Sequence, residues 1–261
     1  MGLTGRWVNS YNSVMQLVQA DTLITGVYTS QTGSTGAYLV AGYAGIASNA
    51  DFSVGQPLAL SIYWRSIEEG KPDPSWHYVS GLSGQLVLQG KVPTLLLLHD
   101  MVATTIFPKV VPQAGTYLDK LIYTPGQAKT PVPDWPEFAH SPVEDPVTGQ
   151  WVSQEASKLQ LTLEVLNANY GYVLGTFQKD EVCVPVVGFT DTHVSVSKNA
   201  LQGLTVSMLL PGDEGVASLS GKLDSSSDTL DLFWMQSQGT ASNSTWIQTQ
   251  HRSLVMKRKA R

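Results

Sequence analysis

Residue combinations that support catalysis are scarce in this chain. His99 and Asp100 are adjacent, and a carboxylate beside an imidazole could orient that ring as a general base. Successive side chains of a strand point to opposite faces, so the pair is not expected to act together in a strand. Cys183, close to Pro185, is predicted to be a small buried residue rather than a nucleophile. No Gly-x-Ser-x-Gly, Walker or Gly-x-Gly-x-x-Gly motif occurs in a suitable context.

The histidines do not indicate a metal centre. Their positions show none of the spacings typical of metal ligands. They are His77, His99, His140, His193 and His251. The single cysteine also excludes an intramolecular disulfide and a cysteine-rich zinc site. We therefore predict neither a metal site nor a cofactor.

Charge and hydropathy limit the classes of partner. The formal net charge of −5 argues against a broad basic surface for nucleic acid. The longest apolar runs, such as Thr94–Leu98, are far shorter than the ~20 residues that span a bilayer. Residues 1–18 lack the basic and apolar layout of a signal peptide. We expect a cytoplasmic protein with no nucleic-acid or membrane partner, unless a leader was removed.

Alternation of polar and apolar residues predicts strands along most of the chain. Only 14% of the residues are charged, well below an average soluble domain, and uncharged polar residues are abundant. Period-two runs include Ala59–Trp64 and Lys158–Val165, separated from their neighbours by clusters of Gly, Asn, Asp and Ser. No amphipathic helix longer than about two turns is evident. The predicted fold class is all-β.

Prolines divide the chain into two parts. Six of the 14 prolines lie between residues 124 and 150. Proline lacks the N–H that a sheet ladder needs and fixes φ, so this stretch is predicted to be an extended linker. The predicted organisation is a first domain at residues 1–124, a proline-rich linker at 125–147 and a second domain at 148–261.

The two flanks resemble each other, which indicates an internal duplication. Residues 4–9 (TGRWVN) recur as residues 148–153 (TGQWVS). Two further pairs of similar segments follow in the same order. Residues 23–28 (LITGVY) resemble residues 172–177 (YVLGTF), and residues 81–86 (GLSGQL) resemble residues 218–223 (SLSGKL). Each half then has a length that suits eight strands closed into an antiparallel up-and-down barrel. We predict two tandem eight-stranded barrels.

The repeated motifs resemble the avidin/streptavidin family of biotin-binding barrels. The opening Leu3–Asn9 (LTGRWVN), followed by Ser13, is similar to the first-strand signature of that family. The next family element, Thr-Gly-x-Tyr-x-Ser, is present as Thr25–Ser30. A Trp followed by Ser-Gly-Gln appears as Trp64 and Ser83–Gln85. The resemblance covers both halves and is strongest at residues 2–45, 58–86 and 231–257.

The resemblance implies a ligand site in the first barrel. Asn9, Ser13 and Tyr28 correspond to the trio that donates hydrogen bonds to the ureido oxygen of biotin, and Ser30 to a residue that receives a ureido N–H. Trp64 would form an apolar wall, with Ser80 near the sulfur of the ligand. An amide, a hydroxyl and a phenol are three donors for one carbonyl oxygen, and aromatic walls with few polar groups are usual in small-molecule pockets. The set of predicted ligand contacts is Asn9, Ser13, Tyr28, Ser30, Trp64, Tyr78, Ser80, Leu82, Leu96, Leu98 and Trp246.

Several positions depart from the family pattern. Leu82 and Leu96 stand where the family has tryptophans, and the acceptor of a ureido N–H on the last strand aligns with Leu121, with Asp119 nearby. The second half has lost more, since Ser153, Ser157, Phe177 and Lys179 replace the polar set and Leu254 the last-strand acceptor. The missing acceptor alone would leave a buried N–H unpaired, at a cost of ~1–3 kcal/mol. Tight biotin binding is therefore not expected, and Leu82, Leu96 and Leu98 would leave a roomier, aliphatic cavity.

The second barrel is predicted to be a structural partner of the first. Trp234 and Trp246 lie 12 residues apart, a spacing similar to that of two tryptophans near the end of family members. In that family one subunit lends a tryptophan to the pocket of its neighbour, which implies that Trp246 reaches into the first barrel. The chain would then be an intramolecular pseudo-dimer, and a homodimer of whole chains is a further possibility.

Two functions from different classes fit these residues. The first is a binder of a small apolar or biotin-like molecule that carries a carbonyl, and a protein that sequesters such a ligand is a variant of it. The alternative is a cofactor-free cyclase or isomerase in which Asn9 and Tyr28 polarise the carbonyl of a natural-product type substrate. We favour the binder, because the resemblance implies binding and no reactive group is added to it.

Overall fold

The computed structural model describes residues 2–30, 36–46, 53–68, 77–106, 111–126, 133–137, 139–155, 159–193, 201–244 and 249–259. These residues form sixteen strands and no helix, which confirms the all-β prediction. Accordingly, the described part of the chain contains no long apolar helix of the kind that crosses a membrane.

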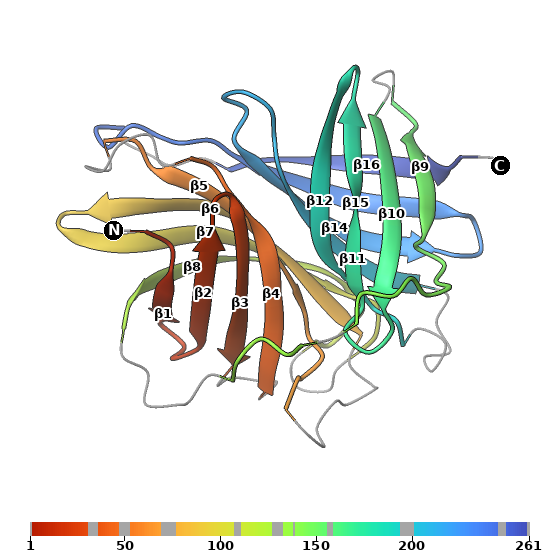
Figure 1. Cartoon of the computed structure of the whole chain (residues 1–261), viewed down its shortest axis with the longest axis horizontal. Helices are drawn as coiled ribbons and strands as arrows, with labels where there is room; N and C mark the ends of the chain where they lie inside the picture. Colours follow the sequence, from red (N-terminus) through yellow and green to blue (C-terminus); the bar gives the residue numbers. More distant parts are fainter. Residues whose placement is uncertain are drawn as a thin grey trace.

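The first eight strands form a closed antiparallel barrel in which β1 closes on β8 (Figure 1). Their bounds are β1 Gly5–Asn9, β2 Val14–Ala20, β3 Leu23–Ser30, β4 Gly36–Ala44, β5 Gln56–Tyr63, β6 Tyr78–Gln89, β7 Val92–Ala103 and β8 Gly115–Pro125. The closing pairs are Asn9 with Tyr123 and Trp7 with Pro125. Pro125 therefore ends a strand, although the proline content predicted that the linker begins there. The pairing of β8 with β7 ends at Tyr123, so the missing N–H of Pro125 costs no ladder bond to β7.

The second eight strands form a second closed antiparallel barrel, in which β9 pairs with both β10 and β16. Their bounds are β9 Gly149–Ser153, β10 Leu159–Asn167, β11 Tyr172–Lys179, β12 Val182–Thr190, β13 Leu201–Leu209, β14 Val216–Asp224, β15 Thr229–Ser237 and β16 Thr249–Arg258. The prediction of two tandem eight-stranded barrels is confirmed.

The start of each barrel is built in the same way. Trp7 and Trp151 are buried in the cores of their barrels. Trp7 Nε1 donates to the carbonyl of Leu3 at 2.8 Å, and Trp151 Nε1 donates to that of Val147 at 3.0 Å. The indole thus fills the end of the barrel while its N–H is satisfied four residues back. The duplicated sequence motif therefore corresponds to a duplicated packing unit.

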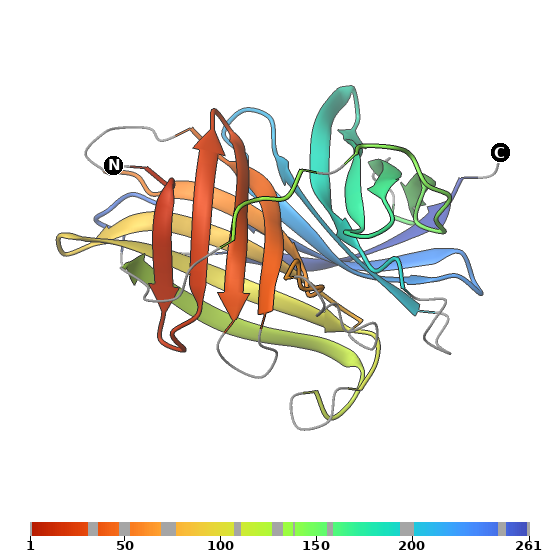
Figure 2. The ribbon, with the colours of Figure 1, turned by 60° about the horizontal axis from the view of Figure 1, so that its bottom comes forward.

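The connection between the barrels is attached to the second one. Val143 N donates to the carbonyl of Val165 at 2.9 Å, and Ser141 N donates to that of Leu166 at 2.9 Å. Val147 is completely buried in the second core. Figure 2 shows this segment running from the first barrel along the edge of the second. The end of the predicted linker is thus held in place by backbone bonds to β10 and by burial.

The outer face of β4–β6 in the first barrel packs against β12–β15 of the second. A buried apolar cluster spans this interface and comprises Leu39, Ala41, Tyr43, Tyr63, Val79, Val102, Leu166, Tyr172, Val187 and Phe189. Small polar side chains pair across it, with Ser61 Oγ 2.8 Å from Ser207 Oγ and Ser83 Oγ donating to Ser237 Oγ at 2.9 Å. The interface therefore resembles the interior of a domain more than a surface contact.

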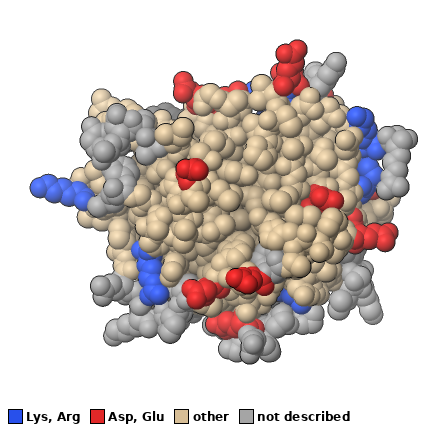
Figure 3. Space-filling view, in the orientation of Figure 1, with Lys and Arg blue, Asp and Glu red and all other residues tan. Residues whose placement is uncertain are grey.

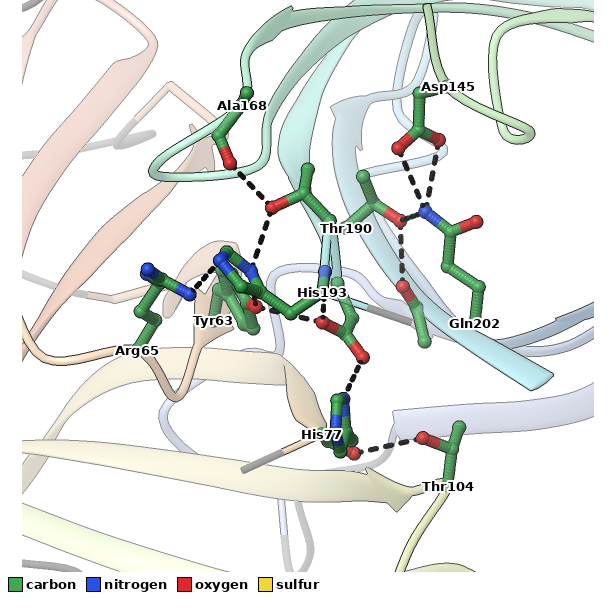
Figure 4. Close-up of polar contacts among 12 residues, drawn as sticks. Tyr63, Arg65, His77, Thr104, Asp145, Ala168, Thr190, His193 and Gln202 are labelled. Carbon is green, nitrogen blue, oxygen red and sulfur yellow. Dashed lines mark hydrogen bonds and ion pairs between the residues drawn. The ribbon is translucent and has the colours of Figure 1, made fainter. Parts of the chain in front are cut away.

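A buried carboxylate joins the two barrels beside this cluster. Asp191 Oδ1 accepts from the Tyr63 hydroxyl at 2.9 Å, and Asp191 Oδ2 lies 2.6 Å from His77 Nδ1. The backbone N–H of His193 donates to Oδ1 at 2.9 Å, and the His193 ring contacts Arg65. Figure 4 shows Tyr63, His77 and His193 pointing toward one another at this junction. Burial together with the neighbouring Asp191 raises the pKa of Tyr63 well above its usual value, so the phenol stays a donor.

We predict that Asp191→Ala destabilises the whole chain. The change leaves the Tyr63 hydroxyl and His77 Nδ1 without their acceptor at a buried interface, which costs about 3 kcal/mol. Urea unfolding followed by fluorescence should show a clearly lower midpoint. Glu214→Ala is the matched control, because Glu214 pairs with Lys179 at the surface and is 41% exposed; its loss should cost less than about 1 kcal/mol. Equal effects of the two substitutions would contradict a stabilising role for the buried junction.

Candidate functional site

Polar side chains gather inside the first barrel where β1, β3 and β8 meet. Asn9, Ser13 and Tyr28 are buried there, as the resemblance implied, and Tyr123 joins them from β8. The Asn9 amide is fixed in place because its Oδ1 accepts from the backbone N–H groups of Tyr11 and Ser13, both at 3.0 Å. This leaves Asn9 Nδ2, which has no partner at full hydrogen-bond geometry in the described part of the chain.

Two phenols share this end of the barrel. Burial raises the pKa of Tyr28, and the nearby polar groups of Ser13, Tyr123 and Asn9 offset part of the rise. The pKa of Tyr123 is raised well above its usual value by burial and by the adjacent Tyr28. Both phenols are therefore neutral donors at ordinary pH. Tyr123 Oη is buried and, like Asn9 Nδ2, has no partner at full geometry among the described residues.

Sequence reasoning missed Tyr123. The last-strand position was assigned to Leu121, with Asp119 nearby, and both of these lie on the same face of β8 as Tyr123. Leu121 belongs to the interior core, so it does provide an apolar wall rather than an acceptor. The pairing of Asn9 with Tyr123 across the closing seam is the signal that identifies Tyr123, and it requires the register of barrel closure.

Trp64 forms the wall between the donor end and a second polar group. Its ring centroid lies 5.5 Å from that of Tyr28 and 4.9 Å from that of Tyr38. Trp64 Nε1 donates to Ser80 Oγ at 2.7 Å, which places the predicted residues Trp64 and Ser80 side by side in the interior. The other predicted residues found buried on this side are Ser30, Tyr78 and Leu82.

His99 and Asp100 point to opposite faces of β7, as the strand alternation predicted. The His99 ring faces the interior, with Nε2 2.8 Å from Ser80 Oγ, and burial lowers its pKa to about 4. Asp100 pairs with Gly81 of β6. Ser218 and Ser220 of the second barrel occupy the space into which a side chain at Gly81 would project. Burial raises the pKa of Asp100 to about 7. Its two carboxylate oxygens have no hydrogen-bond partner in the described residues.

Leu96 and Leu98 do not line the interior, so their assignment to the ligand cavity was wrong. They pair with Gln85 and Ser83, whose side chains bond to the second barrel. Leu97 lies in the interior core instead. Successive side chains of a strand alternate between its faces, so an error of one residue exchanges the inner and outer sets. A run of leucines contains no polar residue that would show which set points outward. Leu96 and Leu98 line a groove of about 620 Å³ between the barrels.

Three further predictions have different outcomes. Trp246, which the resemblance implied would reach into the first barrel, lies outside the described residues. Cys183 is exposed, so the prediction that it is buried was wrong, because its side chain points outward near the start of β12. No cluster of three or more His, Cys, Asp or Glu side chains suited to a metal ion occurs among the described residues.

The second barrel has an apolar interior at the equivalent place. Phe177 and Trp234 pack edge to face with centroids 5.2 Å apart, and Leu254 is completely buried beside them. Ser153, at the position of Asn9, caps the backbone N–H of Glu155. Lys179 pairs with Glu214 at the surface. The polar donor group is therefore present in the first barrel and replaced in the second.

Charged side chains do not mark a further site on the face seen in Figure 3. Acidic side chains are scattered over it, and the Lys and Arg side chains that are visible lie near its margins. No protein-family model matches the chain, and no curated protein matches it. Assignment to the avidin/streptavidin family thus remains a proposal that depends on the sequence motifs and on the two eight-stranded barrels.

We predict that Asp100→Asn stabilises the chain at high pH. The folded-state pKa of about 7 lies above the unfolded value of 3.8, so the carboxyl ionises first in the unfolded chain, and stability is lost as the pH rises from about 4 to 7, with the full penalty present above pH 7. The neutral amide should raise the free energy of unfolding by roughly 2–4 kcal/mol at pH 8. The difference from wild type should shrink toward zero as the pH falls to 4, where both side chains are neutral.

Urea unfolding of both proteins at pH 4, 6 and 8 measures this difference, and the contribution of His99 cancels because both proteins contain it. A difference that is independent of pH would show that burial does not raise the pKa of Asp100, and would contradict the prediction.

Proposed function

We propose that the first barrel binds a small, mainly apolar molecule through a carbonyl oxygen. The observation that carries this proposal is the pair of buried donors Asn9 Nδ2 and Tyr123 Oη, which lie close to each other and to the phenol of Tyr28 but reach no partner at full hydrogen-bond geometry among the described residues. A buried donor without a partner costs ~1–3 kcal/mol. An acceptor oxygen placed between them would recover that cost, and a carbonyl has the lone pairs to accept from two or three donors.

The surroundings favour a ligand without N–H groups beside the carbonyl. Leu121 follows the donor end along β8, and Leu82 and Trp64 belong to the same interior cluster. None of these offers an acceptor for a urea N–H at the position that the family resemblance assigns to one. We therefore favour a ketone or lactone with an apolar skeleton over biotin as the ligand. In this proposal the second barrel is a structural partner of the first.

An enzyme that uses the same donors is the alternative. Neutral donors aimed at a carbonyl would polarise it, and an enclosed apolar interior would hold a flexible substrate in a reactive shape, as a cyclase or isomerase requires. The same phenols support both functions. Conversion of a bound carbonyl compound into an isomer, detected by mass-balanced chromatography, would distinguish the enzyme from the binder.

The binding proposal predicts that camphor raises the melting temperature of the protein and that its carbonyl-free parent, bornane, does not. The shift should grow with ligand concentration as mass action requires. Tyr123→Phe removes one donor and should raise the dissociation constant about tenfold, and Tyr28→Phe should act in the same direction. Tyr170→Phe, in the second barrel, is the control and should bind camphor as wild type does.

Biotin serves as a second probe in the same assay. A strong shift with biotin would contradict the preference for carbonyls without neighbouring N–H groups. Equal shifts with camphor and bornane, or an unaltered affinity in Tyr123→Phe, would remove the donor pair as the recognition element.

A further inference from the structure

Ser80 is held between two nitrogen atoms inside the first barrel. Trp64 Nε1 donates to Ser80 Oγ at 2.7 Å, and His99 Nε2 lies 2.8 Å from the same oxygen. The three side chains come from three different places in the barrel: β6, β7 and the residue after β5. A hydroxyl within hydrogen-bond distance of an imidazole is the arrangement in which a base can activate an oxygen nucleophile.

The hydrogen positions in this group follow from its donors. The Trp64 indole N–H can only donate, so Ser80 Oγ accepts from it. The single hydroxyl hydrogen of Ser80 is then free to point at His99 Nε2, which must be unprotonated to accept it. Burial holds the pKa of His99 near 4, with Asp119 opposing that shift, so the ring is neutral at pH 7. The neutral ring then carries its proton on Nδ1.

Asp119 supplies the third member of the group. It lies directly across from His99 in the pairing of β7 with β8, and side chains that face each other in this way are neighbours on one face of the sheet. Asp119 is exposed and His99 only half-buried, although both lie on the inner face of their strands. Solvent therefore reaches this end of the interior, next to a carboxylate that favours the Nδ1 proton of the neutral ring and would stabilise the imidazolium formed when Nε2 takes a proton.

We propose that Ser80 is a nucleophile for small apolar esters, with His99 as its general base and Asp119 as the residue that positions His99. The inference goes beyond carbonyl binding at Tyr123 and does not require that the donor pair there be occupied. Trp64 neighbours both groups, since its ring centroid lies 5.5 Å from that of Tyr28 and 6.5 Å from that of His99.

The reaction balances with water as its only co-reactant. Ser80 Oγ forms a bond to the ester carbonyl carbon while His99 Nε2 takes the hydroxyl proton, and the carbonyl π electrons move onto its oxygen. The carbonyl re-forms as the bond to the leaving alcohol oxygen breaks, and His99 returns the proton to that oxygen. A water molecule then attacks the acyl-Ser80 carbonyl by the same steps, which releases the acid and restores the serine.

Trp64 contributes the stabilising donor in these steps. Its N–H is already aimed at Oγ, and the oxyanion formed in the attack is bonded to the carbon next to Oγ. A donor in this position can shift to the oxyanion as Oγ becomes an ester oxygen. The surrounding side chains, Leu82, Leu97 and Met101, are apolar and accept a short acyl chain rather than a charged one.

A fluorophosphonate probe and p-nitrophenyl butyrate test the proposal on the full chain. In wild type, mass spectrometry should find the phosphonyl group on the peptide that contains Ser80. Ester hydrolysis should exceed the buffer rate and fall at least 100-fold in Ser80→Ala and in His99→Gln. Ser83→Ala is the matched control, because Ser83 lies on the outer face of the same strand and bonds to Ser237; labelling and hydrolysis should be unchanged in it.

Asp119→Asn tests the positioning role. It should lower kcat about tenfold and leave KM unchanged, and Asp119→Glu should restore part of kcat. Circular dichroism and melting temperatures establish that each variant is folded. Absence of label on Ser80 in the folded wild type, or wild-type hydrolysis by Ser80→Ala, would overturn the proposal. Equal labelling in His99→Gln would overturn the role of His99 as base.

The failure of this proposal can be distinguished from failure of the carbonyl-binding one. His99→Gln should retain the melting shift with camphor, since the donor pair at Tyr123 is intact and His99 is not one of the predicted ligand contacts. A camphor shift without Ser80 labelling would support the binding site and overturn the nucleophile. Labelling without a camphor shift would support the nucleophile and overturn the binding proposal.

Discussion

The central strands of the first barrel are buried on both faces, and the rest of the structure depends on this constraint. Every residue of β4 and of β5 is buried. One face of each strand fills the barrel and the other packs on the second barrel, so each side chain must suit one of two interiors. Trp64 and Tyr63 illustrate the result, because these neighbours face the proposed ligand site and the buried Asp191 respectively. Any shift of β5 would therefore disturb both places together.

The same constraint explains which predictions from sequence succeeded. Strands with one exposed face, such as β10, alternate clearly and were found from periodicity. The burial of Asn9, Ser13, Tyr28 and Trp64 in the first barrel agrees with the short motifs of fixed spacing, not periodicity, that singled them out. Both faces of the segment Thr94–Leu98 pack against other residues, so the polarity of its residues does not show which side chains point into the barrel. Leu96 and Leu98 were therefore assigned to the wrong face.

Other elements of the site needed the register of the closed barrel. Tyr123 comes next to Asn9 only through the pairing of the first and eighth strands, which are more than a hundred residues apart in the chain. His99 was considered with its sequence neighbour Asp100, whereas its spatial neighbours are Ser80 and Asp119. Contacts of this kind are long-range consequences of closure, and local composition carries no information about them.

Joining the two barrels in one chain has a consequence for how the protein can change over time. In a symmetric dimer, one substitution alters the contact surface twice, whereas here Asp191 meets Tyr63 and His77 once in the whole molecule. The tether also keeps the barrels together at any dilution, since each is present at a high effective concentration for the other. The two barrels can therefore differ in sequence. The second barrel has an apolar interior, as the packing of Phe177 on Trp234 illustrates, and still remains bound to the first.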